Sequence, residues 1–249
     1  MTGIWVGLAG FGIVFLSAAL MLGLSILRRK TPPVYRDIPA ITRLRQAVGL
    51  VVEDGSRLHV SLGRGALTSP QSASALAGLS LLRRLADLTS AGDQAPIVTS
   101  GEASLAILSQ DTLRAASNSS GLASFDPSAG RLTGLSPFSY AAGTIPAIRD
   151  ENVSASLLLG NFGVEVGLLT DAVERKNTFV LAGSDNLAAQ AVIYASAQES
   201  LIGEEIYAGG AYVESGPLHT ASLTVQDLLR WLLIAAILVG SLVALAGAL

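Results

Sequence analysis

Acidic and small residues recur where predicted strands give way to predicted helices, and these turns are where chemistry would take place. Three of the turns carry an acid near the start of the next helix, namely Glu102, Glu165 and Asp185. In a parallel sheet the strand ends and the helix N-termini meet at one edge, where ligands bind. Arg64 offers a positive charge at the same edge. The candidate ligand rim comprises Arg64, Gly101, Glu102, Gly160, Asn161, Gly163, Gly183, Ser184 and Asp185.

These residues have three possible roles. The one we favour is helix capping, because the helix dipole stabilises an acid in the first turn by about 0.3–1 kcal/mol. Ser184, Asp185 and Asn186 also suit N-cap positions. The second is a phosphate or nucleotide site built from backbone N–H groups, with Arg64 as the counter-charge. The third is acid–base catalysis by a hydrolase or transferase.

Several other chemistries lack their sequence signatures. The glycines of residues 160–167 are spaced three and then four apart, whereas the dinucleotide fingerprint needs two and then three. No lysine follows a glycine loop, as a P-loop requires, and no G-x-S-x-G elbow occurs. His59 and His219 lie about 160 positions apart and there is no cysteine, which disfavours zinc. We expect no catalytic residue and no metal ligand, and the cofactor stays unknown.

The elements that would position the rim alternate regularly between strand and helix. Because the helices are long enough for right-handed crossovers, the pattern predicts a Rossmann-like, mostly parallel α/β sheet of about five strands in three layers. The predicted strands are 58–62, 96–99, 131–135, 153–159 and 178–181. The predicted helices are 70–91, 102–118, 137–150, 164–176 and 186–199. His59 should be a buried, hydrogen-bonded or strand-face residue, opposite Leu58 and Val60. A long surface loop is expected over 117–131.

The two ends of the chain are apolar and uncharged. All 16 Lys and Arg and all 19 Asp and Glu lie between Arg28 and Arg230. We therefore predict transmembrane helices over 4–27 and 228–249, with the lipid bilayer as a partner. A cleaved signal peptide is the alternative for the first, but no basic residue precedes it. Basic residues after the first span place 28–230 in the cytoplasm and both termini outside, in the inner membrane.

The remaining segments connect the spans to the predicted domain. Residues 28–56 are a membrane-proximal linker and helix, 57–199 the domain, and 200–227 a return segment that is neither clean strand nor clean helix. In the linker helix, Ile41, Leu44 and Val48 form an apolar face. Arg43 and Arg45 suggest that this helix lies on the headgroups as a collar. The net charge of −3 argues against a nucleic-acid partner.

Small residues suggest close helix packing. Ala236, Gly240, Ala244 and Ala248 recur every four positions and form a smooth stripe on the second span. The alternative is that Gly and Ala are simply common in membrane spans. The paired glycines Gly209 and Gly210 suggest close packing of the return segment. We assign both sets to self-association.

Several segments together resemble an uncharacterised bacterial membrane family, a domain of unknown function with a transmembrane helix at each end. They are GLLTDAVERKNTFVLAGSD (167–185), NLAAQA (186–191), LIGEEIYAGGAY (201–212), GPLHTAS (216–222) and QDLLRW (226–231). The resemblance implies the two-anchor topology, and it brings no activity.

The function that we expect is that of a non-enzymatic, membrane-anchored and homo-oligomeric scaffold. One alternative is a membrane sensor that binds a nucleotide or small metabolite at the rim. The other is a carboxylate-dependent hydrolase or transferase.

Overall fold

The computed structural model describes residues 2–27, 36–69, 72–90, 92, 94–119, 125–213 and 217–247. The chain divides into two compact units, each of which is treated separately. Arg36–Ser215 forms an α/β domain, and Met1–Tyr35 with Gly216–Leu249 forms a helical unit.

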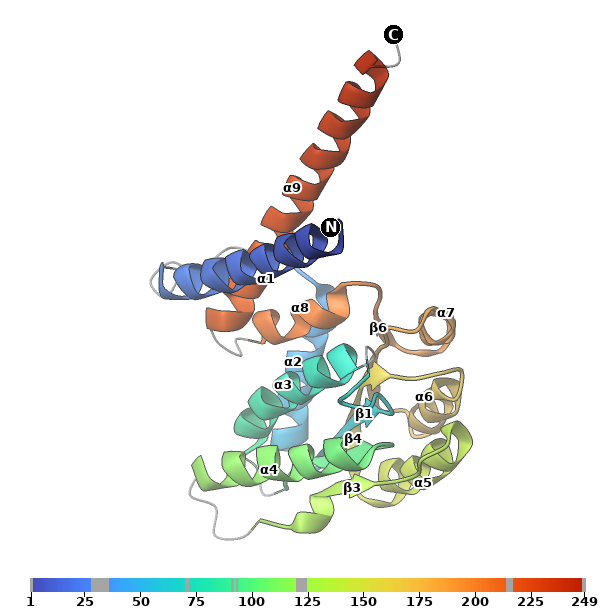
Figure 1. Cartoon of the computed structure of the whole chain (residues 1–249). Coiled ribbons are helices and arrows are strands. Elements are labelled where there is room, and N and C mark those ends of the chain that lie inside the picture. The colour runs from blue at the N-terminus through green and yellow to red at the C-terminus, as the bar shows by residue number, and fades with distance from the viewer. Residues whose placement is uncertain are drawn as a thin grey trace. The chain divides into compact units, whose positions relative to one another are not determined.

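The domain is built on a parallel sheet (Figure 1). Its six strands are β1 (Arg57–Gly63), β2 (Ile97–Ser100), β3 (Gly130–Leu132), β4 (Val153–Asn161), β5 (Phe179–Gly183) and β6 (Glu199–Leu201). Their order is β3-β2-β1-β4-β5-β6, and every neighbouring pair is parallel. The chain therefore winds outward in both directions from a switch point between β1 and β4.

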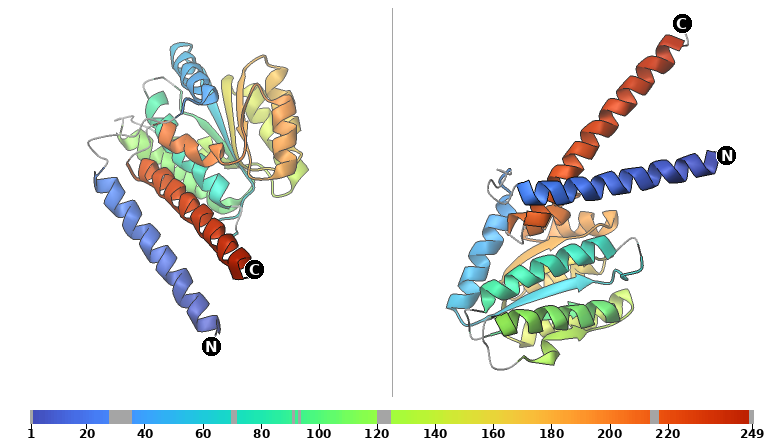
Figure 2. Two further views of the ribbon diagram at one scale, coloured as in Figure 1. Left: turned by 90° about the horizontal axis from the view of Figure 1, so that it is seen from above. Right: turned by 60° about the vertical axis from the view of Figure 1, so that its left-hand side comes forward.

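Helices cover both faces of the sheet (Figure 2). Those of the domain are α2 (Pro39–Glu53), α3 (Ser72–Thr89), α4 (Ala103–Ser119), α5 (Pro137–Asp150), α6 (Val166–Glu174), α7 (Leu187–Ser196) and α8 (Glu205–Tyr212). Alternation along β1 explains the two cores, because Leu58, Val60 and Leu62 lie in the core with α2, α3 and α4. The opposite face packs against α5, α6 and α7.

The sixth strand corrects the predicted count of about five. Residues 186–199 were predicted as one helix, but α7 ends at Ser196 because Ala197 is extended, with φ −90° and ψ 146°. Glu199 and Leu201 are then buried as β6 pairs with β5. Three residues are too few to show an alternating pattern, so this edge strand escaped the prediction.

The membrane-proximal helix α2 is part of the domain core, which corrects its assignment as a surface collar. Leu44 is fully buried, and Ile41, Val48 and Val51 join it in the main core. Arg43 pairs with Glu199, and Arg45 donates to the carbonyl of Tyr212. The apolar face that suggested lipid contact thus packs on the sheet and its helices.

The return segment also has regular structure. It contains β6, the helix α8 and the start of the last helix. Ile206 of α8 is fully buried in the main core, and Gly209 and Gly210 are buried too. A Cβ at Gly209 would lie 3.9 Å from Leu81 Cδ2, in ordinary contact with α3. Both glycines are therefore enclosed within the domain, and their role in self-association stays a prediction.

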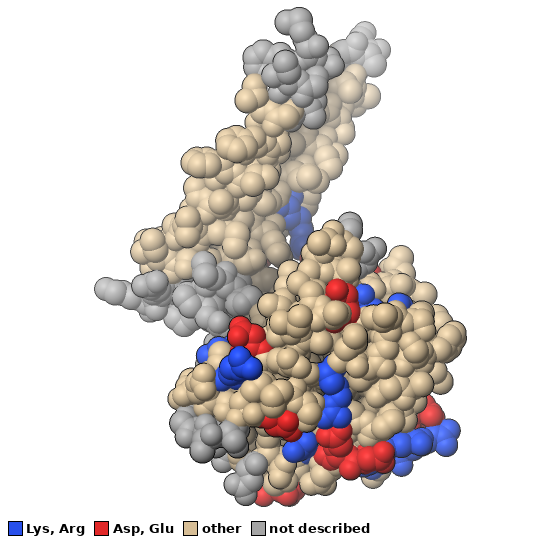
Figure 3. All heavy atoms as spheres, turned by 60° about the horizontal axis from the view of Figure 1, so that its bottom comes forward, with Lys and Arg blue, Asp and Glu red and all other residues tan. Residues whose placement is uncertain are grey.

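The helical unit consists of α1 (Thr2–Leu27) and α9 (Pro217–Gly247), which contact one another and run in opposite directions (Figure 2). Gly10–Leu27 and Ala221–Ala246 are long and apolar enough to cross a membrane, by length and composition. Figure 3 shows both helices as almost wholly uncharged. Ala236, Gly240 and Ala244 are exposed, whereas Ala248 lies outside the described residues.

Candidate functional site

The carboxyl edge of the sheet is shaped by a close approach of β1 and β4 at the switch point. Gly63 has φ +68°, a conformation that favours glycine. A Cβ at Gly63 would overlap the backbone of Asn161, and one at Gly160 would overlap the carbonyl oxygen of Leu62. The amide of Arg64 donates to the carbonyl of Asn161 at 2.9 Å. Gly63 and Gly160 therefore allow the backbones of β1 and β4 to approach closely at this edge.

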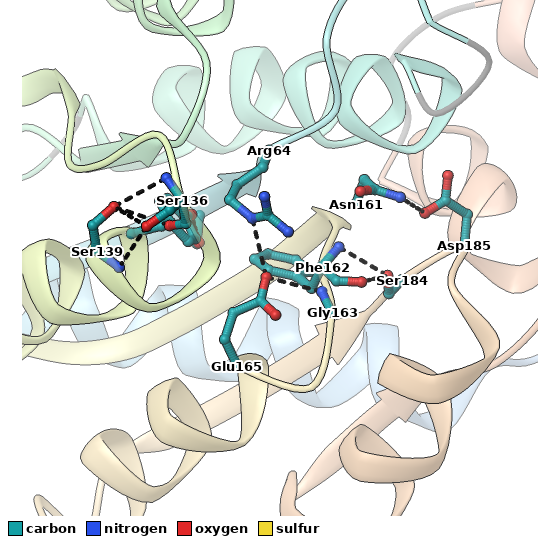
Figure 4. A network of polar contacts seen from close by, with 11 residues as sticks. Arg64, Ser136, Ser139, Asn161, Phe162, Gly163, Glu165, Ser184 and Asp185 are labelled. Carbon is teal, nitrogen blue, oxygen red and sulfur yellow. Dashed lines mark hydrogen bonds and ion pairs between the residues drawn. The ribbon is translucent and has the colours of Figure 1, made fainter.

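Arg64 crosses this edge and pairs with Glu165 (Figure 4). Its Nε lies 3.1 Å from Glu165 Oε1, and the same oxygen accepts from the Gly163 amide at 2.9 Å. Glu165 is 2% exposed, whereas the Arg64 side chain is 22% exposed. Two glycines make room, since a Cβ at Gly101 would overlap the Arg64 stem and one at Gly163 would overlap Glu165 Oε2.

A second group of contacts joins the ends of β4 and β5. Asn161 Nδ2 donates to Asp185 Oδ1 at 2.8 Å, and the Phe162 amide donates to Ser184 Oγ at 3.1 Å (Figure 4). Asn186 is the N-cap of α7, because its Oδ1 accepts from the Ala188 amide at 2.9 Å. The capping predicted for Asn186 is confirmed, while Ser184 and Asp185 join neighbouring strands instead.

The other two members of the candidate rim have local roles. Glu102 Oε2 accepts from the Leu105 amide at 3.0 Å and from Ser104 Oγ, so it caps the start of α4. Gly183 lies within the sheet, where a Cβ would be 3.1 Å from Leu159 Cδ1 and 3.2 Å from Leu201 Cβ. The structure thus brings Arg64, Gly101, Gly163 and Glu165 into one cluster, and Asn161, Ser184 and Asp185 into a second.

Sequence reasoning missed a buried polar network beneath α5. His59 Nε2 lies 2.9 Å from Thr99 Oγ1, and Ser61 Oγ is hydrogen-bonded to Tyr140 Oη. Burial raises the pKa of Tyr140, although neighbouring hydroxyls such as that of Ser61 oppose the shift. The available signal was that His59, Ser61 and Thr99 would share one face of adjacent strands.

The pKa of His59 is strongly shifted by its surroundings. His59 is fully buried and hydrogen-bonded, the first of the two predicted alternatives, and burial, reinforced by the charge of Arg131, lowers its pKa to about 3. Within the described residues its Nδ1 has no hydrogen-bond partner, and the same holds for Ser156 Oγ on the neighbouring strand β4. His59 is therefore neutral at physiological pH and lies inside the sheet rather than at the rim.

In the part of the chain that the structure describes, no group of three or more His, Cys, Asp and Glu is arranged to hold a metal ion. His219 falls in α9 at a position whose side chain is outside the described residues. The three acids of the edge have protein partners: Glu102 accepts from the Leu105 amide, Glu165 from the Gly163 amide and Arg64, and Asp185 from the Asn161 side chain.

The geometry defines a protein with a parallel α/β domain and two long apolar helices. Residues 6–249 match the family model described as a domain of unknown function, DUF6754. The chain belongs to this family. Neither the curated proteins nor the solved structures gave a match.

Proposed function

We propose that this protein is a membrane-anchored, self-associating scaffold whose α/β domain lies in the cytoplasm. The observation that carries the proposal is the apolar surface of the helical unit. Phe11, Val14, Trp231 and Val243 are all 66–70% exposed. Apolar surface of this extent is stable in lipid or against another protein, but not in water.

The occupied carboxyl edge supports a non-catalytic role. An enzyme of a doubly wound fold binds its ligand at this edge, with donors free to meet it. Here the Gly163 amide and the Nε of Arg64 are already bound to the carboxylate of Glu165. The donors at this edge therefore stabilise the fold through Glu165.

The basic residues that closely follow the first predicted span support the orientation. Arg36, Arg43 and Arg45 lie within about 18 residues of the end of that span, where the positive-inside rule counts charge. With the domain in the cytoplasm, both termini would lie outside the inner membrane. The opposite directions of α1 and α9 fit two spans that enter and leave on the same side.

The test is the subunit count of the full-length chain in nanodiscs or mild detergent. Gly240 has nothing within 4 Å of a built Cβ, so Gly240→Leu leaves the monomer undisturbed and obstructs only a contact between helices. We expect Gly240→Leu to reduce assembly. Ala235→Leu, on the opposite side of α9, is the control. A wild type that is monomeric at every concentration would overturn the proposal.

A nucleotide sensor is a second candidate, favoured by the strand order and by one feature of Arg64. The order 3-2-1-4-5-6 is that of the Rossmann dinucleotide-binding domain. Among the described residues, the only side-chain partner of Arg64 is Glu165, through Nε, which leaves the terminal nitrogens available to an anion. A thermal shift with ATP, NAD or inorganic phosphate that Arg64→Ala abolishes would establish this function. Three ligands without a shift would exclude it for these classes.

A further inference from the structure

The helix α7 differs from its neighbours in having no charge. Its sequence, LAAQAVIYAS, contains no Asp, Glu, Lys or Arg, whereas α2, α3, α4, α5, α6 and α8 each contain at least one. Only Ala189 and Ile193 of α7 are buried. A helix on a protein surface normally turns a charged or polar face to water. The outer face of α7 is apolar instead.

That outer face is formed by five exposed residues. They are Leu187, Ala188, Ala191, Tyr194 and Ala195. Leu187 is 81% exposed and Tyr194 is 77% exposed, which makes them two of the most exposed large hydrophobic side chains of the domain. The spacing of three and four residues places all five on one side of the helix.

The face is also self-complementary. Its five positions are symmetric about Ala191, at four and three residues on either side. If a second copy of α7 packs antiparallel across Ala191, Leu187 faces Ala195 of the other copy and Tyr194 faces its Ala188. Large residues thus meet small ones at both ends, as close helix packing requires. Because no charge is present, the two-fold contact has no like-charge repulsion and buries no unpaired ion.

We propose that α7 is a contact between two copies of this chain, packed antiparallel about a two-fold axis through Ala191. The inference rests on the proposed self-association and names the surface that the domain uses for it. Small residues at the crossing let the helix axes approach to about 8 Å, the short end of the range for packed helices.

The absence of cysteine from the chain makes the contact directly testable. In the full-length protein in membranes, Ala191→Cys should form a disulfide with its own copy under mild oxidation. A disulfide needs Cβ atoms within about 4.5 Å, so we expect about tenfold more covalent dimer than from Ala103→Cys, an exposed alanine on α4. Leu187→Cys and Ala195→Cys should cross-link when the two variants are mixed, and neither alone.

A charge on the face provides the second measurement. Leu187→Asp puts an acid in the first turn of α7, where the dipole favours it, so the domain stays folded. It should raise the dimer dissociation constant at least about tenfold, which corresponds to 1.4 kcal/mol. Ile107→Asp, on the outer side of α4 and 66% exposed, is the matched control.

The outcomes separate this inference from the proposed function. Cross-linking of Ala191→Cys together with weakened assembly of Leu187→Asp supports both. A native multimer in which Ala191→Cys gives no more dimer than Ala103→Cys overturns the α7 contact and leaves the scaffold standing. A monomeric wild type overturns both.

Discussion

At the scale of single residues, the carboxyl edge contains a buried acid that is paired with a largely buried arginine. Glu165 is 2% exposed and its Oε1 accepts from Arg64 Nε and from the Gly163 amide. A buried carboxylate that loses its cationic partner keeps the cost of desolvation. The ion pair between Arg64 and Glu165 therefore stabilises the fold at the switch point.

Removing the arginine alone should cost more than removing both charges. We expect Arg64→Ala to lower the free energy of unfolding by about 3 kcal/mol, because it leaves Glu165 buried without its cationic partner. Arg64→Ala with Glu165→Gln should recover part of this loss. Urea unfolding of the three proteins measures the difference. A single variant as stable as the wild type would show that Glu165 needs no counter-charge.

The buried histidine gives a pH dependence with a definite sign. The pKa of His59 is about 3 in the folded state, against its ordinary value of 6.5, so the unfolded state binds the extra proton. The contribution of His59 to the free energy of unfolding is fully present above pH 6.5 and is lost as the pH falls from 6.5 towards 3. Between pH 6.5 and 5 the unfolding free energy should fall by up to about 1.4 kcal/mol per unit.

Chemical denaturation at several pH values measures this slope in His219→Asn, where His59 is the one remaining histidine. His59→Gln with His219→Asn should lose the slope over the same interval. An unchanged slope without His59 would assign the pH dependence to other groups.

At the scale of elements, local sequence patterns predicted helix bounds well, but the sequence did not predict contacts between residues far apart in the chain. The helix predicted over 137–150 has those bounds in the structure, because Ser136 and Ser139 form a capping box and Pro137 follows the cap. The acids of the rim could also be picked out from the sequence, because the start of a helix is set by neighbouring residues. The partner of Arg64 lies 101 residues away, and only the observed strand order brings the two together.

The α2 helix shows why an apolar face cannot reveal what covers it. Its spacing predicted an amphipathic helix, which is confirmed, but the cover is the domain core rather than lipid. The hydrogen bond between Ser61 and Tyr140 was not predicted for a similar reason. The sequence around a polar strand residue does not show which distant side chain it will contact.

The glycines at the switch point should be intolerant of any side chain. A Cβ at Gly160 would overlap the carbonyl of Leu62, which belongs to the backbone of the neighbouring strand. Gly160→Ala should therefore destabilise the domain by more than about 3 kcal/mol, at or beyond the upper end of overpacking effects.

Gly49→Ala is the control, because nothing lies within 4 Å of a Cβ there and the residue is inside helix α2. It should raise stability by about 0.5–1 kcal/mol. Thermal unfolding by circular dichroism compares the two variants. Equal effects would show that β1 and β4 can separate without loss.

At the scale of the whole molecule, the proposed membrane location depends on the two long apolar helices. The mean hydropathy is 2.2 over Gly10–Leu27 and 2.4 over Ala221–Ala246. Two anchors would confine the copies to one plane, which raises their effective concentration and lets weak contacts assemble them. In the proposed assembly, the uncharged α7 and the small-residue stripe of α9 would both be contacts between copies.

The orientation can be read with single cysteines in the otherwise cysteine-free chain. In intact cells, a membrane-impermeant maleimide should fail to label Ala103→Cys in the domain until the membrane is opened. Thr2→Cys, ahead of the first span, should be labelled in intact cells. The reverse pattern would place the domain outside.

Self-association in the membrane is the central claim, and native mass spectrometry of the full-length protein released from nanodiscs tests it most directly. The spectrum reports subunit number and any retained ligand together. We predict a defined multimer whose mass is an integral multiple of the chain. A monomer that retains a few hundred daltons of small molecule would contradict the scaffold and favour the sensor.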